Sequence, residues 1–289
     1  MTTHHTARPM ATDAVRRRPR SGTRVRRSSL MTAIEEPGGH SIHRLAATFG
    51  VSPSTIRRDL RALEADKQVF RIYGGAVSLA QTESSWHEKE HTQSLAKRSI
   101  ALTAARLVDD GDVVLLDAGT STAALAALLA ENATLTLAAM GLSSLVAAAD
   151  GKAELIVVGG RLRRPNAGVA GSFSEMMLDL IQPTKAFLGC DSIDVVKGLN
   201  CPDFDQAALK MRSMNTTSAN WVLADYTKFA MPAAFAYWAG LGPATGIITD
   251  ALTLETNPDL VYRLREVGHD VIIAAPHTSA GSDDLVALG

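Results

Sequence analysis

The stretch SIHRLAATFGVSPSTIRRDLRALEADKQVFRIYGGA, from Ser41 to Ala76, decides the fold of the amino-terminal part of the chain. It predicts two short helices around a tight turn, followed by a hairpin that closes on glycines. Gly50 suits the left-handed backbone conformation that ends the first helix, and Val51 packs the turn. The apolar face of that helix is predicted at helical spacing, at Ile42, Leu45, Ala46 and Phe49.

The helix after the turn is predicted to carry its charges on one side. Ser52 is placed to cap it, and Pro53 occupies the first position, where a missing N–H costs nothing. The buried stripe is expected at Ile56, Leu60 and Leu63. The exposed side holds hydroxyls and guanidinium groups, from Ser54, Thr55, Arg57, Arg58 and Arg61. This pattern is typical of a recognition helix that reaches bases and phosphates, and the alternative is an ordinary helix pair with a solvated basic face.

The run VSPSTIRRDLRALE, followed by RIYGGA, resembles the winged helix-turn-helix of the DeoR family of bacterial transcriptional regulators. The resemblance implies binding to a double-stranded DNA operator. Major-groove contacts are then expected from the recognition helix, and backbone or minor-groove contacts from Arg71 and Tyr73 on the wing. Tyr73 stands where the family more often has histidine. The predicted DNA-binding residues are Ser52, Ser54, Thr55, Arg57, Arg58, Arg61, Arg71 and Tyr73.

Charge divides the chain of 289 residues into two unlike parts. Residues 1–80 contain 14 Lys and Arg against 6 Asp and Glu, whereas the remaining 209 residues contain 15 against 24. This division fits a DNA-binding module joined to a domain that does not touch the polyanion. We predict a disordered basic extension at 1–24, a DNA-binding domain at 25–78, a linker at 79–93, a sensor domain at 94–275 and a loose tail at 276–289.

The sequence gives no sign of export or of membrane insertion. Two cysteines, Cys190 and Cys201, form no disulfide framework or metal spacing, and the apolar runs are too short to span a bilayer. A cytoplasmic protein is therefore expected. His87 and His91 have the i, i+4 spacing of metal ligands, but no third ligand is in register, so a solvated linker is preferred.

From about Ser94 onward, β-prone apolar runs alternate with helical patterns. Such alternation predicts an α/β fold, a doubly wound, mostly parallel sheet with helices on both faces. No GxGxxG fingerprint occurs, so a dinucleotide is not expected. No cofactor is assigned. The predicted strands lie near 113–116, 134–138, 155–158, 185–189, 221–224, 246–249 and 271–274, and the predicted helices near 121–130, 142–149, 173–181, 204–219 and 256–266.

Polar residues follow several of these strands, where ligands bind in doubly wound folds. Asp117-Ala118-Gly119-Thr120-Ser121-Thr122 offers hydroxyls and N–H groups at a helix start, which favours an anion such as phosphate. The alternative is a helix cap with a solvated aspartate. Other strand ends carry Gly160-Arg161, Gly189-Cys190-Asp191 and the run from Asp225 to Phe229, in which Asp225 and Lys228 could hold a hydroxyl and a phosphate together.

The runs LLDAGTST, VVGGRLR, KAFLGCD and LADYTKF resemble the sensor domain of the same family. The resemblance implies a fold similar to ribose-5-phosphate isomerase and a phosphorylated sugar or polyol as effector. Ala139-Met140 stands where the family usually has Thr-Asn, which removes two polar groups and is expected to weaken or shift effector binding. The predicted effector-binding residues are Asp117, Gly119, Thr120, Ser121, Thr122, Gly160, Arg161, Asp191, Lys210, Asp225 and Lys228.

These patterns together predict a repressor of a carbohydrate or polyol metabolism operon, acting as a homo-oligomer of two or four subunits. The first alternative is a sugar-phosphate isomerase-like enzyme with a DNA-binding appendage, in which Asp191 and Lys228 would serve as base and electrophile. The absence of an obvious buried glutamate base argues against it, and no catalytic residue is assigned. The second alternative is a regulator whose sensor answers a protein partner and binds no sugar phosphate.

Overall fold

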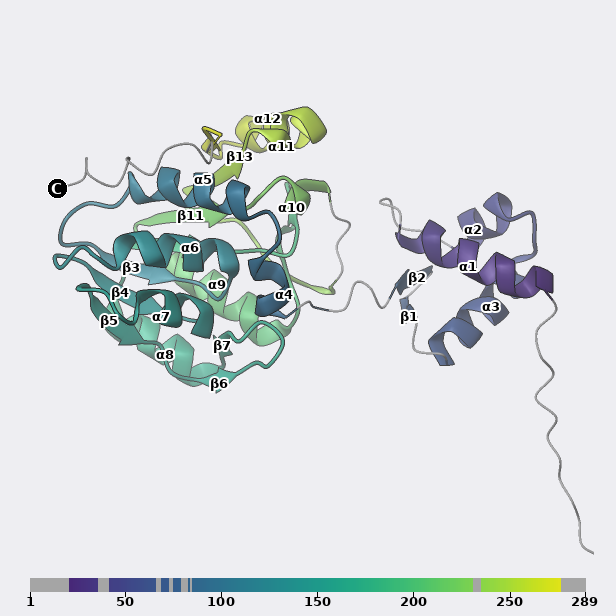
Figure 1. The fold of residues 1–289 in the computed structure, drawn as a ribbon, viewed down its shortest axis with the longest axis horizontal. Coiled ribbons are helices and arrows are strands. Elements are labelled where there is room, and N and C mark those ends of the chain that lie inside the picture. Colours follow the sequence, from purple (N-terminus) through teal and green to yellow (C-terminus); the bar gives the residue numbers. More distant parts are fainter. Residues whose placement is uncertain are drawn as a thin grey trace, which may run out of the picture. The chain divides into compact units, whose positions relative to one another are not determined.

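The structure is a computed structural model, and it describes residues 21–35, 42–65, 69–72, 75–78, 83, 85–230 and 235–276. The chain divides into two compact units, Met1–Ala80 and Gln81–Gly289, and each unit is described by itself (Figure 1). Within the described ranges, every helix is too short or too polar to cross a lipid bilayer.

The amino-terminal unit contains three helices and a hairpin: α1 (Ser21–Glu35), α2 (Ile42–Thr48), α3 (Pro53–Ala65), β1 (Val69–Ile72) and β2 (Gly75–Ser78). Its buried core combines Leu30 of α1 with the apolar residues predicted on α2 and α3, and Phe49 packs against it. Gly50 is left-handed, with φ of +59°, as predicted. The helix-turn-helix and the hairpin are thereby confirmed. Helix α1 begins at Ser21, within the segment predicted as a disordered extension.

A buried carboxylate joins α1 to the recognition helix α3. Asp59 is only 2% exposed, and it accepts hydrogen bonds from the Nε atoms of Arg26 (2.8 Å) and Arg27 (3.1 Å). Because a buried carboxylate needs compensating charge, this aspartate in the TIRRDL motif has a structural role. Two of the basic residues in the amino-terminal segment are thus engaged in holding the unit together.

The second unit is built on a parallel sheet of seven strands in the order β14-β13-β11-β8-β3-β4-β5. The chain starts in the middle with β3 (Val113–Leu116), moves outward through β4 (Thr136–Ala139) and β5 (Glu154–Val157), then returns to β8 (Lys185–Leu188). It continues on the other side through β11 (Ala219–Leu223), β13 (Thr245–Asp250) and β14 (Val271–Ala274). All neighbours pair in parallel, which confirms the predicted doubly wound fold.

Helices cover both faces of this sheet, because each central strand is apolar on both sides. One core contains Val114 and Leu116 of β3 with residues of α5 (Ser94–Ala105), α6 (Thr120–Leu129) and α7 (Leu142–Ala148). The other contains Leu115 with residues of α8 (Ser172–Ile181), α9 (Phe204–Thr216) and α12 (Pro258–Glu266). The strand order reverses between β3 and β8, which is where ligands bind in such folds.

Several elements differ from the sequence-based prediction. Helix α4 (Trp86–Glu90) lies in the predicted linker 79–93. The predicted helix 256–266 is present as α12, which begins at Pro258, and α11 (Leu252–Thr256) before it was not predicted. Helix α10 (Thr227–Ala230) follows β11. Two small antiparallel sheets were not predicted, one from β6 (Arg161–Leu162) and β7 (Val169–Ala170), the other from β9 (Ile193–Asp194), β10 (Gly198–Cys201) and β12 (Tyr237–Ala239).

Candidate functional site

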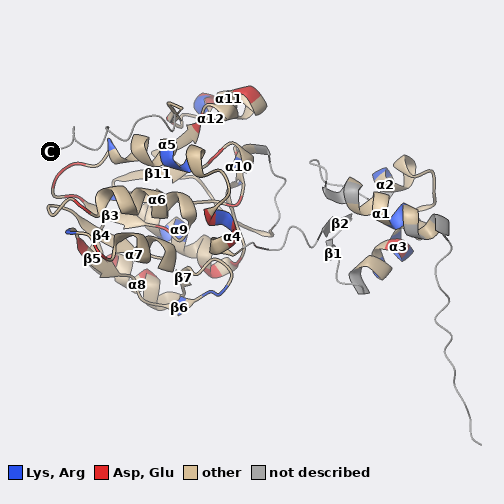
Figure 2. Ribbon diagram, viewed as in Figure 1, with Lys and Arg blue, Asp and Glu red and all other residues tan. Residues whose placement is uncertain are grey.

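The exposed face of α3 carries the predicted DNA-binding side chains. Arg57, Arg58 and Arg61 are exposed, whereas Ile56 and Leu60 on the opposite face are completely buried. Figure 2 colours the ribbon blue at the Lys and Arg positions that the structure describes. The three guanidinium groups therefore extend from one side of a helix whose other side is fixed in the core, as a duplex-reading helix requires.

The hydroxyls at the start of α3 are organised by Ser52. Its Oγ lies 2.7 Å from that of Ser54 and 2.9 Å from Oγ1 of Thr55, and it accepts a hydrogen bond from the Thr55 N–H at 3.2 Å. Ser52 therefore caps the helix, as predicted. Ser54 remains exposed and Thr55 half-buried, so both stand at the helix start.

The wing is described only in part. Arg71 lies in β1, opposite Ala76 of β2, in a regular antiparallel pair. Tyr73 lies outside the described residues. The backbone thus places Arg71 on the hairpin, and the DNA contacts of both residues remain predictions.

In the second unit, a cavity opens at the carboxyl ends of β3, β8 and β11, next to the point where the strand order reverses. Its wall is formed by side chains and backbone from α4, α5, α6, α9 and α10 and from the loops between them. The lining residues are Trp86, Lys89, Thr92, Lys97, Ala118, Gly119, Thr120, Ser121, Thr122, Asn166, Gly189, Cys190, Lys210, Leu223, Asp225, Thr227 and Lys228.

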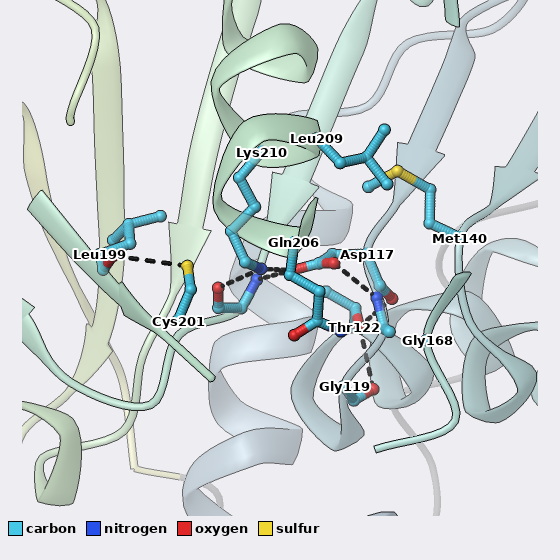
Figure 3. Close-up of polar contacts among 12 residues, drawn as sticks. Asp117, Gly119, Thr122, Met140, Gly168, Leu199, Cys201, Gln206, Leu209 and Lys210 are labelled. Atoms are coloured by element: carbon cyan, nitrogen blue, oxygen red, sulfur yellow. Dashed lines mark hydrogen bonds and ion pairs between the residues drawn. The ribbon is translucent and has the colours of Figure 1, made fainter. Parts of the chain in front are cut away.

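A buried ion pair forms the floor of this cavity. The ammonium of Lys210, on α9, contacts a carboxylate oxygen of Asp117 at the end of β3, and it donates to the Gly189 carbonyl at 2.8 Å (Figure 3). Asp117 also accepts from the N–H groups of Gly189 (2.9 Å) and Ala118 (2.7 Å). Burial by itself lowers the pKa of Lys210, but the Asp117 carboxylate outweighs it and the net pKa is raised. The Lys210 ammonium therefore stays charged, with Asp117 and the Gly189 carbonyl as its two contacts.

The start of α6 faces the cavity without a side-chain cap. Gly119 precedes the helix, and the Thr122 hydroxyl is turned inward to the carbonyls of Asp117 (2.7 Å) and Gly119 (2.9 Å). The first N–H groups of a helix have no partner within it, so those of Thr120 and Ser121 are open to an anion. The backbone of Gly119 is extended, with φ of 176°, and does not itself require glycine.

Two other glycines hold the loop before α6 in place. A Cβ on Gly141 would come within 2.5 Å of Ala118, and one on Gly168 within 2.7 Å of the Ala118 methyl group. Two backbone segments therefore pack directly on this residue, which lines the cavity.

Four lysines give the cavity wall its charge: Lys89, Lys97, Lys210 and Lys228. Lys97 is only 6% exposed and donates to the backbone carbonyl of Lys89. Burial lowers the pKa of Lys97 to about 8, with Lys228 and Lys89 adding repulsion and Asp225 opposing the shift. Among the residues that the structure describes, no acceptor contacts the Lys228 ammonium. The wall therefore carries positive charge that favours an anion.

Asp225 is the acidic side chain in the wall. One oxygen accepts hydrogen bonds from the N–H (3.0 Å) and the hydroxyl of Thr227, and the other accepts none from any described residue. That free oxygen suits a ligand hydroxyl. Cys190 contributes a neutral thiol, because burial raises its pKa to about 12.

The structure brings together most, but not all, of the predicted effector-binding residues. Gly119, Thr120, Ser121, Thr122, Lys210, Asp225 and Lys228 line the cavity. Asp117 lies behind Lys210, and Asp191 pairs with Lys89 at 2.6 Å, so both act through a lysine of the wall. Gly160 and Arg161 do not line it, and Arg161 pairs instead with Asp205 on the surface at 2.5 Å. Ala139 and Met140 are buried in the protein interior and do not reach the cavity, so their effect on effector contacts is not direct.

One side of the cavity was not predicted from the sequence. Trp86 and Lys89 belong to α4, which replaces part of the predicted linker, and Asn166 belongs to the loop between β6 and β7. A signal for α4 was present: Ser85 and Glu88 form a capping box, with the Ser85 hydroxyl accepting from the Glu88 N–H and the Glu88 carboxylate accepting from the Ser85 N–H. No comparable signal marks Asn166.

Comparison with known proteins identifies a matching family for each unit. The profile of the DeoR-like helix-turn-helix domain matches residues 26–82, and that of the DeoR C terminal sensor domain matches residues 92–251. The glycerol-3-phosphate regulon repressor of Escherichia coli (strain K12) is 28% identical, over 71% of this chain and 82% of its own. The transcriptional repressor AccR of Agrobacterium fabrum is 30% identical, over 83% and 95%. The uncharacterized HTH-type transcriptional regulator FruR of Bacillus subtilis is 31% identical, over 79% and 92%.

Among solved structures, ribose-5-phosphate isomerase A from Methanocaldococcus jannaschii matches with a TM-score of 0.35 and 19% identity, covering 46% of this chain and 53% of that one. A TM-score this low supports no conclusion about function. The fold assignment depends on the strand order described above.

Replacing Lys210 by methionine is expected to destabilise the second unit by about 3–5 kcal/mol, because Asp117 would stay buried without its partner. Adding Asp117→Asn should recover part of the loss, since the uncompensated charge is removed. Lys228→Met is the matched control and should change the free energy of unfolding by no more than about 0.5 kcal/mol. Denaturant unfolding of the purified variants measures all three, and equal stability of the Lys210 and Lys228 variants would contradict the role given to the ion pair.

Proposed function

Because the chain belongs to the DeoR family of transcriptional regulators, we propose that it represses an operon of carbohydrate or polyol metabolism and that a phosphorylated sugar or polyol controls its affinity for the operator. The observation that carries the proposal is the cavity wall, which joins four lysines to an uncapped helix start in the same chain as an exposed arginine-bearing helix. A phosphate dianion is the ligand that such a wall favours.

We place the phosphate between the start of α6 and the ammonium of Lys228, with Lys97 as a second cation. The sugar hydroxyls then lie toward the free oxygen of Asp225 and toward Asn166, and the indole ring of Trp86 covers an apolar side of the sugar. Lys210 contacts the ligand through its remaining N–H, since its other two N–H groups are directed to Asp117 and to the Gly189 carbonyl.

The enzyme alternative is not favoured. The relatives named above are transcriptional regulators and repressors. Asp191, the base in that alternative, is paired with Lys89 and does not line the cavity. A general base must reach the proton that it removes, and a carboxylate held behind a lysine does not meet this condition.

Control of DNA affinity requires that the effector bind two conformations unequally. The change in operator affinity cannot exceed the ratio of effector affinities for those conformations. We propose a dimer or tetramer as the active form, because a duplex with two half-sites is read by two recognition helices at fixed spacing. Because its proposed operator lies on chromosomal DNA, we propose that the protein acts in the cytoplasm.

Binding of a phosphorylated sugar is expected to raise the melting temperature of the full chain. At about 100 times the dissociation constant, the ligand adds roughly 2.7 kcal/mol of stability. The panel contains inorganic phosphate, glycerol 3-phosphate, ribose 5-phosphate, fructose 1-phosphate and fructose 6-phosphate, with each unphosphorylated parent as its control. A shift with at least one ester and with no parent supports the proposal. No shift with any ester favours the regulator that responds to a protein partner.

Arg58→Ala is expected to weaken operator binding by about 1–3 kcal/mol, because an exposed guanidinium on the recognition helix is lost without disturbing the core. The measurement is a titration, at fixed salt, of a duplex that the wild-type protein selects from genomic fragments. Arg106→Ala, at the end of α5 in the other unit, is the control and should bind as wild type does. Unchanged affinity in the Arg58 variant would remove this residue from the DNA-binding surface.

Effector affinity is expected to fall as the pH rises above about 8. The pKa of Lys97 is lowered to about 8, and a bound dianion raises it, so binding above that pH must take up a proton. The affinity then decreases by up to about tenfold per pH unit until the pKa of the complex is reached. Titration calorimetry with the panel ester of largest thermal shift measures this dependence. Lys97→Met should bind more weakly but with no such dependence, and a flat wild-type profile would exclude Lys97 from the site.

A further inference from the structure

Arg163 forms a clamp between separate parts of the second unit. Its guanidinium is bidentate to Glu83, at 2.8 and 2.6 Å, its Nε contacts Asp203, and one N–H donates to the Gln206 side chain at 3.2 Å. Arg163 is 12% exposed and Glu83 is 8% exposed, so this is not a loose surface pair. Burial disfavours the charged guanidinium, but these carboxylates raise its pKa, with Asp191 also contributing. Glu83 and Arg163 are called the clamp pair below.

The clamp pair is close in sequence to the boundary between the units. Glu83 comes three residues after Ala80, where the first unit ends. The loop that carries Arg163 also holds α4, because the Pro165 carbonyl accepts a hydrogen bond from the Trp86 N–H at 3.1 Å. Residues 163–166 therefore fix the place where the chain enters the second unit.

The same residues touch the cavity. Asn166 lines it and donates to Gln206 at 3.1 Å, and Gln206 is the residue that also accepts from Arg163. On the other side of the clamp pair, Trp86 and Lys89 of α4 line the cavity as well. A ligand in the cavity thus contacts neighbours of both members of the clamp pair.

Charge provides the connection between ligand and clamp pair. The Lys89 ammonium is bound to Asp191 at 2.6 Å, and Asp191 is one of the carboxylates that act on Arg163. A dianion against the cavity wall attracts Lys89 away from Asp191. That carboxylate, left without its partner, then competes with Glu83 for Arg163.

We propose that the ion pair between Glu83 and Arg163 transmits occupancy of the cavity to the DNA-binding unit, because an anionic ligand that takes Lys89 from Asp191 weakens the hold of Arg163 on Glu83. The inference rests on the proposed function, since it assigns a route to the effector response. Without the Glu83 contact, the first fixed residue of the second unit becomes Ser85, which the capping box of α4 holds, so the tether gains up to about 7 Å. A longer tether lowers the effective concentration of a second recognition helix at its half-site, so operator affinity decreases.

The test uses the full chain without ligand and measures operator affinity at fixed salt. Glu83→Gln removes the negative charge of the clamp pair, whereas Lys89→Met keeps both clamp residues but frees Asp191 to compete for Arg163. Each single variant is expected to bind the operator about three- to tenfold more weakly than wild type. The double variant should bind no more than about twofold more weakly than the single variant of lower affinity, because both changes loosen the same contact between Glu83 and Arg163. Asp179→Asn is the matched control, since Asp179 also receives two N–H groups of one arginine, Arg212, but lies outside the loop and the cavity. It should bind as wild type does.

Two results would overturn the inference: operator affinity of Glu83→Gln within about twofold of wild type, or losses that multiply in the double variant. Melting curves identify a variant that fails to fold. If Glu83→Gln fails to fold, the Lys89→Met variant tests the inference, and its amide exchange over residues 83–90 is expected to be faster than that of wild type. The ester panel on wild-type protein separates the two proposals. A wild-type thermal shift with an unaffected Glu83→Gln variant contradicts the clamp alone, whereas no shift with any ester contradicts the effector proposal.

Discussion

The buried pair between Lys210 and Asp117 is the interaction on which the second unit depends most. It joins α9 to the end of β3 at the point where the strand order reverses, and through Gly189 it also fixes the end of β8. A lysine without a partner in this place would tend to lose its proton, and an aspartate without one would gain a proton. Because each compensates the other, a polar floor is maintained beneath a cavity that remains basic.

The two units use buried carboxylates in the same way. Asp59 ties α1 to the recognition helix through two arginines, as Asp117 ties α9 to the sheet through a lysine. In both, the acid is internal, and the side chains proposed to meet an anion are other cations nearby, which form no ion pair with any residue that the structure describes: Arg57 and Arg58 on α3, and Lys228 in the cavity. In each unit, the surface proposed to bind an anion is thus supported by an acid that lies behind it.

Sequence patterns predicted the parts of the structure whose signal is local and repeated. The apolar runs of the central strands, the left-handed Gly50 and the Ser52 cap are all predictable from the sequence, because each follows from a few neighbouring residues. The short strands β6 and β9 carry two residues each, too few for a period. Asn166 and the Glu83–Arg163 pair depend on contacts across 40 and 80 positions, which no local pattern contains.

The packing of Gly141 and Gly168 against Ala118 limits how this receptor could diversify. Since both backbones already touch the Ala118 methyl group, a bulkier residue at 118, 141 or 168 would displace the loop that begins α6. Changes that retune recognition are therefore easier in other parts of the wall, such as α4 and Cys190. Evolution, or an engineer seeking a biosensor for a new metabolite, would vary those parts while leaving the three packed positions unchanged.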